Sequence, residues 1–263
     1  FRRVLFRSFL FLMSDSSACD FCNCYLGLNP HYKKNTFGVR YHYFLYKGSH
    51  LSNAELSDMN MSPSDFSETR TTIEMHGQWY PVQKFQMIYS LPYMMSHEHA
   101  MVEEHSGEHI SGIGDPLLLG HYQVFNKTES ESSYYSQRMF AGGGVKFPLG
   151  KWKLEEDAEA NERVHMPGTG SWDFLLSAVY LGKYKRTGFN INSTYLLTTS
   201  NSQQFQFANR FNANATGYYQ IQLKKAMLYP GVGAYLEQAG KDFNVNSTLE
   251  NSGGTILFAH AGL

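Results

Sequence analysis

The sequence is poor in charge and in cysteine, and it contains no long apolar run. Charged residues make up 17% of its 263 residues, against about 25% in ordinary soluble domains. No apolar stretch approaches the roughly 18 residues of a membrane-spanning helix, which excludes a helical membrane protein. The formal net charge of -1 gives no electrostatic basis for nucleic-acid binding.

Aromatic residues are abundant instead, with 19 Phe and 18 Tyr. Between residues 209 and 223, apolar or small side chains occupy every odd position from Phe211 to Leu223, and mostly polar ones the even positions. A period of two predicts an extended strand with one apolar and one wet face. The stretch exceeds the usual globular strand of about 5–6 residues and suits a tilted transmembrane strand of roughly 9–11.

Nine further stretches repeat this alternation. The predicted strands are 36–47, 71–80, 85–93, 112–125, 134–149, 171–184, 189–199, 209–223, 228–238 and 255–263. Their connections alternate in length, as in outer-membrane barrels with short periplasmic turns and long external loops. A β-sandwich has no reason to sort its loops in this way. We therefore expect an all-β, antiparallel transmembrane β-barrel in the bacterial outer membrane, with the longer connections outside.

The two ends of the sequence carry separate expectations. Residues 1–8 resemble the translation of a sequencing adapter, and residues 9–18 resemble the end of a signal peptide cleaved after Ala18. A native amphipathic start is the alternative. The barrel, 36–263, is expected to be incomplete at its C-terminus, with about ten strands out of 12 or more, because bacterial barrels close with an even number of strands.

The segment 19–35 is expected to be periplasmic and holds all three cysteines, Cys19, Cys22 and Cys24. Thiolates are soft metal ligands. Two of the three could instead form a disulfide in an oxidising compartment and leave one thiol over. Acylation of Cys19 is a third interpretation. Inert thiols or a disulfide are the plainer alternative, because a structural zinc site takes four ligands.

Histidine and methionine cluster in the expected external loop 94–111. The candidate ligands are Met94, Met95, His97, His99, His105 and His109. Imidazole suits zinc and copper, and thioethers suit cuprous ion. We predict weak binding of copper or zinc that is lost near about pH 5, as the imidazoles become protonated. The alternative is a solvated loop with incidental histidines, because a His-rich tract is only compositional evidence.

Several charged side chains stand at the alternate positions that form the polar faces of the predicted strands. They are Arg40, His42, Glu74, His76, Lys146, Asp173 and Lys183. On the lipid face such a charge would cost about 2–4 kcal/mol at mid-bilayer, so they are expected to line the lumen. They could select solutes or simply fill a narrow, salt-bridged interior. We also expect Gly142, Gly143 and Gly144 where the wall bends or narrows, so that a bulky residue at Gly143 changes passage.

Three segments resemble a known family. Segments 112–117 (GIGDPL), 142–150 (GGGVKFPLG) and 167–173 (PGTGSWD) are similar to outer-membrane barrels of the phenol-degradation meta-pathway transporter type, distant relatives of FadL-like hydrophobic-compound channels. The Cys-rich start and the His-rich loop are most similar to a Bacteroidetes-type branch. The resemblance implies passive passage of a small molecule across the outer membrane.

Two classes of function follow from these expectations. The first is a passive channel for uptake or export of a small molecule, with outer-membrane lipid around it and a link to metal handling through metal-efflux partners. The second is a surface metal-binding or adhesion-type protein whose barrel is only an anchor. No catalytic constellation is present in the sequence, so we do not expect an enzyme or a required cofactor.

Overall fold

The computed structural model describes residues 9–10, 35–50, 64–100, 109–128, 134–152, 166–224, 227–245, 247–249 and 252–262. The secondary structure of these residues consists of strands and their connections. Among them, no helix is long and apolar enough to cross a membrane.

Ten long strands form one antiparallel sheet. They are β2 (Thr36–His50), β3 (Ser64–Val82), β4 (Phe85–Ala100), β6 (Leu117–Lys127), β7 (Tyr135–Lys146), β8 (Asp173–Tyr184), β9 (Thr187–Leu197), β11 (Arg210–Tyr219), β14 (Gly231–Ala239) and β17 (Gly254–Gly262). Each pairs with the long strand before and after it in the chain. Each of the ten predicted strands overlaps one of these long strands, and the antiparallel all-β fold is confirmed.

Shorter strands complete the structure. In the main sheet, β1 (Phe9–Leu10) pairs with β17, and β5 (His109–Ile113) pairs with β4. A three-stranded sheet holds β10 (Phe205–Gln206), β15 (Phe243–Asn244) and β16 (Ser247–Thr248). A two-stranded sheet holds β12 (Ile221–Gln222) and β13 (Met227–Leu228).

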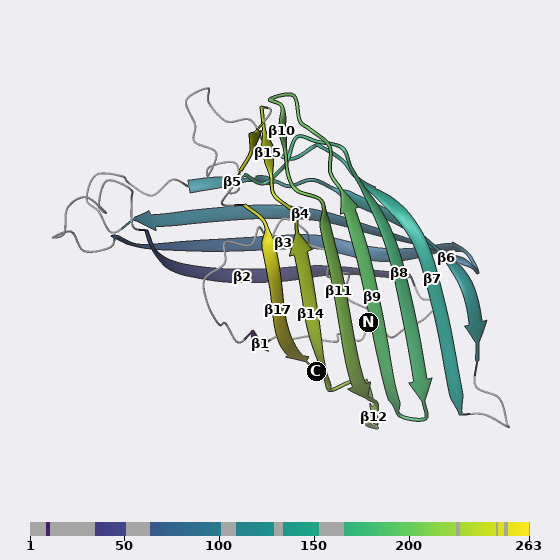
Figure 1. The fold of residues 1–263 in the computed structure, drawn as a ribbon. Coiled ribbons are helices and arrows are strands. Elements are labelled where there is room, and N and C mark those ends of the chain that lie inside the picture. Colours follow the sequence, from purple (N-terminus) through teal and green to yellow (C-terminus); the bar gives the residue numbers. More distant parts are fainter. Residues whose placement is uncertain are drawn as a thin grey trace.

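The main sheet is curled into a half-barrel, and it bends near β6. In Figure 1, β2, β3 and β4 run across the picture, whereas β7 to β17 run down it. Glycines stand at the bend: a Cβ atom on Gly142 would overlap the carbonyl oxygen of Gly120, and one on Gly144 would lie 2.5 Å from the carbonyl oxygen of Leu118. The two strands approach so closely that only glycine fits, which confirms the close approach expected for this segment.

The polarity of the sheet is inverted relative to a soluble domain. On β9, Phe189, Ile191 and Tyr195 are exposed, whereas Asn190 and Asn192 between them are buried. We call the face with the buried polar side chains the inward face, because side chains on the concave side of a curled sheet are crowded together. The apolar outward face suits contact with lipid, as in transmembrane barrels.

A small apolar cluster interrupts the polar inward face. Leu119, Leu175 and Leu196 pack together, with Ile88 and Leu117 against them. The register places these side chains in one row across the sheet, because Leu119 faces Gly144, Gly144 faces Leu175, and Leu175 faces Leu196. At this row the inward face is apolar and its side chains are packed together.

The connections alternate between the two ends of the sheet, as predicted. One end, here called the turn end, holds residues 83–84, 128–134, 185–186 and 220–230; the opposite loop end holds residues 51–63, 101–108, 147–172, 198–209 and 240–253. This sorting by length follows directly from a meander of antiparallel strands with short turns on one side.

Two predicted loops are partly wrong. β2 and β3 extend into the connection expected between the predicted strands 36–47 and 71–80, and β4 and β5 extend into the expected loop 94–111. These extensions carry polar side chains on both faces, so hydropathy alternation does not reveal them, and it is the pairing of β3 with both neighbours that makes them strands. The predicted strand 112–125 is split at 114–116, where Pro116 has no N–H to donate to the ladder.

Candidate functional site

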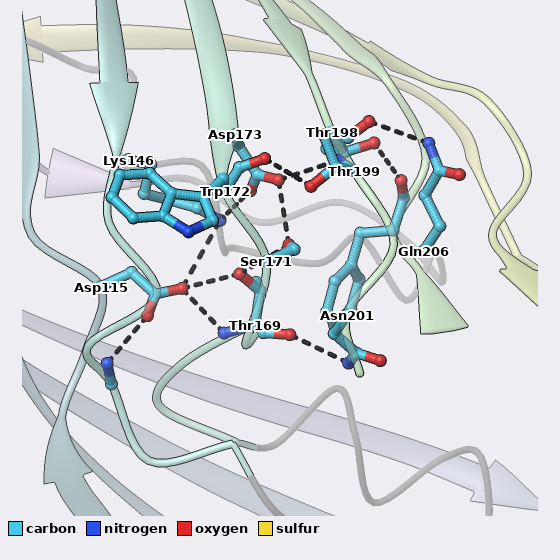
Figure 2. A network of polar contacts seen from close by, with 12 residues as sticks. Asp115, Lys146, Thr169, Ser171, Trp172, Asp173, Thr198, Thr199, Asn201 and Gln206 are labelled. Carbon is cyan, nitrogen blue, oxygen red and sulfur yellow. Dashed lines mark hydrogen bonds and ion pairs between the residues drawn. The ribbon is translucent and has the colours of Figure 1, made fainter. Parts of the chain in front are cut away.

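A buried carboxylate, Asp115, forms the centre of the largest polar network at the loop end. It lies in the break between β5 and β6, and only 7% of its surface is exposed. The backbone N–H of Gly150 donates to its Oδ1 at 2.9 Å. The N–H and hydroxyl of Thr169 donate to its Oδ2 at 2.8 and 2.7 Å (Figure 2). Asp115 therefore ties the connection between β7 and β8 to the start of β6.

Two glycines allow this carboxylate to be enclosed. A Cβ atom on Gly150 would lie 2.7 Å from the Cα of Gly168 and 2.9 Å from Oδ1 of Asp115. A Cβ atom on Gly168 would lie 2.7 Å from the Cα of Gly150 and 2.9 Å from the same carboxylate oxygen. The two backbones are therefore in direct contact beside Asp115. Side chains at either position would force them apart, which explains why glycine stands at both.

Lys146 connects Asp115 to a second buried carboxylate, Asp173. Its Nζ lies 2.5 Å from Oδ2 of Asp173 and 3.7 Å from Oδ2 of Asp115. The hydroxyl of Ser171 and the backbone N–H of Thr199 donate to Oδ1 of Asp173 at 3.0 and 3.2 Å. One cation between two carboxylates leaves a local charge of -1, which these neutral donors help to stabilise.

The hydrogen bonds continue into the next two connections. Asn201 donates from Nδ2 to the carbonyl of Thr169 at 3.1 Å, and the N–H of Ala208 donates to Oδ1 of Asp242 at 2.7 Å. Burial raises the pKa of the Asp242 carboxyl, although the hydrogen bond from Ala208 and the charge of Arg210 act in the opposite direction. The connections at the loop end are therefore joined to one another from β6 to β14.

The three segments that carry the family resemblance meet in this network. Segment 112–117 supplies Asp115, segment 142–150 supplies Lys146 and Gly150, and segment 167–173 supplies Thr169 and Asp173. Periodicity could not have shown this, because three of these residues, Asp115, Gly150 and Thr169, lie outside strands. We call these three segments and their contacts the Asp115 clamp. Its carboxylates are occupied by protein donors, so its chemistry is that of a rigid support.

The seven charged residues expected in the lumen all lie on the inward face. They fall on the same alternating positions as the buried polar residues of β2, β3, β7 and β8. Two groups form: Arg40 NH1 and His42 Nε2 lie 3.2 and 3.7 Å from Oε2 of Glu74, and Lys146 pairs with Asp173. His76 shares the inward face with the first group, and Lys183 lies near the turn end of β8. Their role in selectivity stays a prediction.

Some inward residues were not predicted. Arg210 NH1 lies 3.3 Å from Oε1 of Glu237, and the hydroxyl of Tyr235 donates to Asn212 and lies 2.8 Å from Glu237. His121 is fully buried, and neither ring nitrogen has a hydrogen-bond partner among the described residues. The sequence could have identified them, because Arg210 and Asn212 stand at even positions of the stretch 209–223, which form its polar face.

Gly143 lies on the opposite side of β7 from Gly142 and Gly144, and the effect of a bulky residue there on passage stays a prediction. It lies on the outward alternation of β7, whereas Gly142 and Gly144 lie on the inward one, with the buried Phe140 and Lys146. The alternation of β7 runs through all three glycines, so inspection of the glycine run alone could not show which of them faces the interior.

The proposed metal ligands are only partly brought together. His97 on β4 and His109 on β5 are register partners, and Met95 shares the outward alternation of His97. Met94 is wrong as a common ligand, because it is buried on the inward face. His99 lies opposite Ser67 in the register. His105 and the three cysteines lie outside the described residues. Among the described residues, no three His, Cys, Asp or Glu side chains are grouped to hold a metal ion.

Comparison with known proteins adds one finding. No family model matches the sequence, and no curated protein matches it. The structure is similar to the crystal structure of an outer membrane channel from Pseudomonas putida F1, with a TM-score of 0.54 and 13% sequence identity. The similarity covers 89% of this chain and 85% of that chain. It shows a shared fold, the antiparallel β architecture of an outer-membrane channel.

Proposed function

We propose that the protein is a passive outer-membrane channel for small solutes, as the resemblance to meta-pathway and FadL-like transporters implies, and that these solutes are uncharged. One observation carries the proposal: a ten-stranded antiparallel meander with an apolar exposed face and a polar buried face. Only a closed barrel satisfies backbone groups in lipid when strands cross it. The fold shared with an outer membrane channel supports the same conclusion.

The charges on the inward face favour an uncharged solute. Arg40 faces Glu74, Arg210 faces Glu237, and Lys146 lies between Asp115 and Asp173. With three cations against four carboxylates, these groups create little net potential along a passage, so neither sign of ion is strongly concentrated there.

Neutral hydrogen-bonding groups fill the space between these pairs. Asn190 Oδ1, Asn192 Oδ1 and Asn212 Nδ2 have no hydrogen-bond partner among the described residues. A buried polar group without a partner costs about 1–3 kcal/mol. A hydrated passage, or a solute that donates and accepts hydrogen bonds, would supply these partners. The leucine row at Leu119, Leu175 and Leu196 limits the size of such a solute.

Liposome swelling tests the channel directly. Purified protein is folded into vesicles, and swelling rates are compared for neutral polyols of increasing size and for a charged sugar acid of matched size. We expect swelling that falls with solute size and is slower for the sugar acid. Protein that is folded and inserted, as shown by heat-modifiable migration, but that causes no swelling with any solute would overturn the channel function.

A second function, metal binding at the loop end, is favoured by the register of His97 and His109. Two imidazoles on adjacent strands, with Met95 on the same face as His97, suit weak copper or zinc binding. Calorimetric titration of the whole protein with cupric and zinc ions tests it. We expect His97→Ala to weaken binding and Met94→Leu, on the opposite face, to leave it unchanged. Equal heats from the wild type and His97→Ala would exclude the site.

A further inference from the structure

The turn end of the sheet carries exposed cations in, or directly beside, each of its connections. Lys84 lies between β3 and β4, Lys127 ends β6, Lys185 and Arg186 join β8 to β9, and Lys224 follows β12. All five are exposed, and we call them the basic collar. Backbone hydrogen bonds place its parts side by side: Gln123 N–H donates to the Lys84 carbonyl at 2.8 Å, and Gln220 N–H to the Arg186 carbonyl at 2.7 Å.

The two ends of the sheet differ in charge. Among the described turn-end residues, in 83–84, 128, 134, 185–186, 220–224 and 227–230, there is no Asp or Glu. The remainder of these connections adds Glu129, Glu131 and Lys225. The connection between β7 and β8 is acidic in sequence by contrast. Its residues 153–165 include Glu155, Glu156, Asp157, Glu159 and Glu162, against Lys153 and Arg163.

Exposed tyrosines accompany the collar on the outward face. Tyr134 and Tyr184 are 61% and 55% exposed, and the Nζ of Lys185 lies 4.9 Å and 5.5 Å from the centres of their rings. Tyrosine is enriched at the level of lipid headgroups, where its ring is half apolar and its hydroxyl is wet. A lysine held over two such rings is therefore placed at headgroup depth.

The backbone at Lys185 is unfavourable for lysine. Its φ is 53°, a left-handed conformation that favours glycine or asparagine in a two-residue hairpin turn. A cation thus stands where the turn alone would prefer Asn or Gly. Non-glycine residues held in such conformations cluster at functional positions.

We propose that the basic collar binds the phosphate groups of anionic phospholipids in the leaflet that the turn end faces. The proposal rests on the membrane location given under the proposed function. The charge of the collar, its exposure in or beside every turn and the tyrosines beside it match an anionic headgroup layer. Each cation near such a surface increases lipid affinity by on the order of fivefold, so replacing two should lower it by about tenfold or more.

Native mass spectrometry of the whole protein in detergent tests this, with phosphatidylglycerol and phosphatidylcholine competing for binding. We expect the wild type to retain phosphatidylglycerol preferentially and Lys185→Gln with Arg186→Gln to lose most of that preference, by about tenfold. The matched control removes two exposed cations at the loop end, Lys151→Gln with Lys241→Gln, and should keep it. Equal retention of both lipids by the wild type, or equal loss in the control, would overturn the proposal.

A second variant separates lipid binding from a structural role of the turn. Lys185→Asn removes the charge and suits the positive φ, so it should raise the stability of the folded protein while lowering the phosphatidylglycerol preference. A purely structural role of Lys185 predicts unchanged lipid preference in this variant, and that result would also overturn the proposal. Swelling measured with the same variants folded into vesicles reports channel function separately, so a protein that prefers phosphatidylglycerol but passes no solute refutes the channel alone.

Discussion

The two charge clusters of the inward face are built in different ways. Around Glu74, the partners Arg40, His42 and Ser90 are side chains of neighbouring strands, and each strand would pair without them. Around Asp115, two of the donors are backbone N–H groups, from Gly150 and Thr169, in the connection between β7 and β8, which lies outside the strand ladder. The Glu74 cluster balances charge between strands that would pair without it, whereas the Asp115 clamp holds the connection between β7 and β8 in place.

This difference predicts where the loop end is vulnerable. A strand keeps its ladder of hydrogen bonds when one side chain is removed. A connection held by one buried carboxylate loses several hydrogen bonds at once and leaves buried backbone donors without partners, which is the more expensive loss.

Removal of the Asp115 carboxylate should have the largest effect. In Asp115→Ala, the N–H groups of Gly150 and Thr169 and the hydroxyl of Thr169 lose their acceptor, whereas Lys146 keeps its closer partner Asp173. Each buried donor left without a partner costs about 1–3 kcal/mol, so we expect a total loss of about 3–5 kcal/mol. The free energy of unfolding in urea, measured in vesicles, checks this. Asp115→Asn keeps a neutral acceptor and should lose less. A loss below about 0.5 kcal/mol in the alanine variant, typical of a plain surface site, would contradict the clamp.

The glycines at the bend provide the next test, because they probe the packing of β6 against β7 independently of the Asp115 clamp. Gly142→Ala would place a methyl group on the carbonyl oxygen of Gly120, whereas the nearest atom to a methyl at Gly143 is the carbonyl oxygen of Leu175 at 3.1 Å. We expect Gly142→Ala to lower the free energy of unfolding by about 1–3 kcal/mol, as overpacking does.

The matched Gly143→Ala variant should have a clearly smaller effect in the same unfolding measurement, because a small shift of its neighbour relieves the contact. Equal losses in the two variants would contradict this explanation, because, of the two, only a methyl group at Gly142 would overlap β6.

Neutralisation of Glu74 should have a moderate effect. Glu74→Gln keeps an acceptor for Ser90 but removes the charge beside Arg40, whose side chain is 19% exposed. Partial solvation screens the pair, so we expect a loss of about 1–2 kcal/mol, below the 3–5 kcal/mol of a fully buried pair. Urea unfolding at low and high salt measures it. A loss as large as that of Asp115→Ala would erase the distinction between the two clusters.

The sequence predicts the strands of the main sheet far better than the Asp115 clamp, for a physical reason. Each strand carries its own period of two, so Asn190 and Asn192 could be assigned to the polar face from their spacing alone. Asp115 and Thr169 stand in connections, where no period exists, and 54 positions separate them in the chain. The polar extension of β4 beyond Met94 was missed because alternation fades where both faces are polar, although the chain remains paired.

The smallest expected effect concerns Asp242, which joins the last described connections of the loop end. Burial raises the pKa of its carboxyl above the ordinary 3.8. The folded state therefore holds the proton up to a higher pH than the unfolded state does. The contribution of this group to stability falls as the pH rises through the range between the pKa of the unfolded state and the higher pKa of the folded state. On acidification towards about pH 4, the docked connection should gain stability relative to a variant that cannot titrate.

Hydrogen exchange at the N–H of Ala208, which donates to Oδ1 of Asp242 at 2.7 Å, measures this locally. After correction for the intrinsic exchange rate, its protection in the wild type should increase on acidification relative to Asp242→Asn, which keeps an acceptor oxygen. The N–H of Leu249, which donates to the backbone carbonyl of Asp242 at 3.0 Å, reports on the same connection without contacting the carboxyl. If protection of Ala208 has the same pH dependence in both proteins, the carboxyl of Asp242 does not titrate in this window, and the docking of the connection depends on its backbone contacts alone.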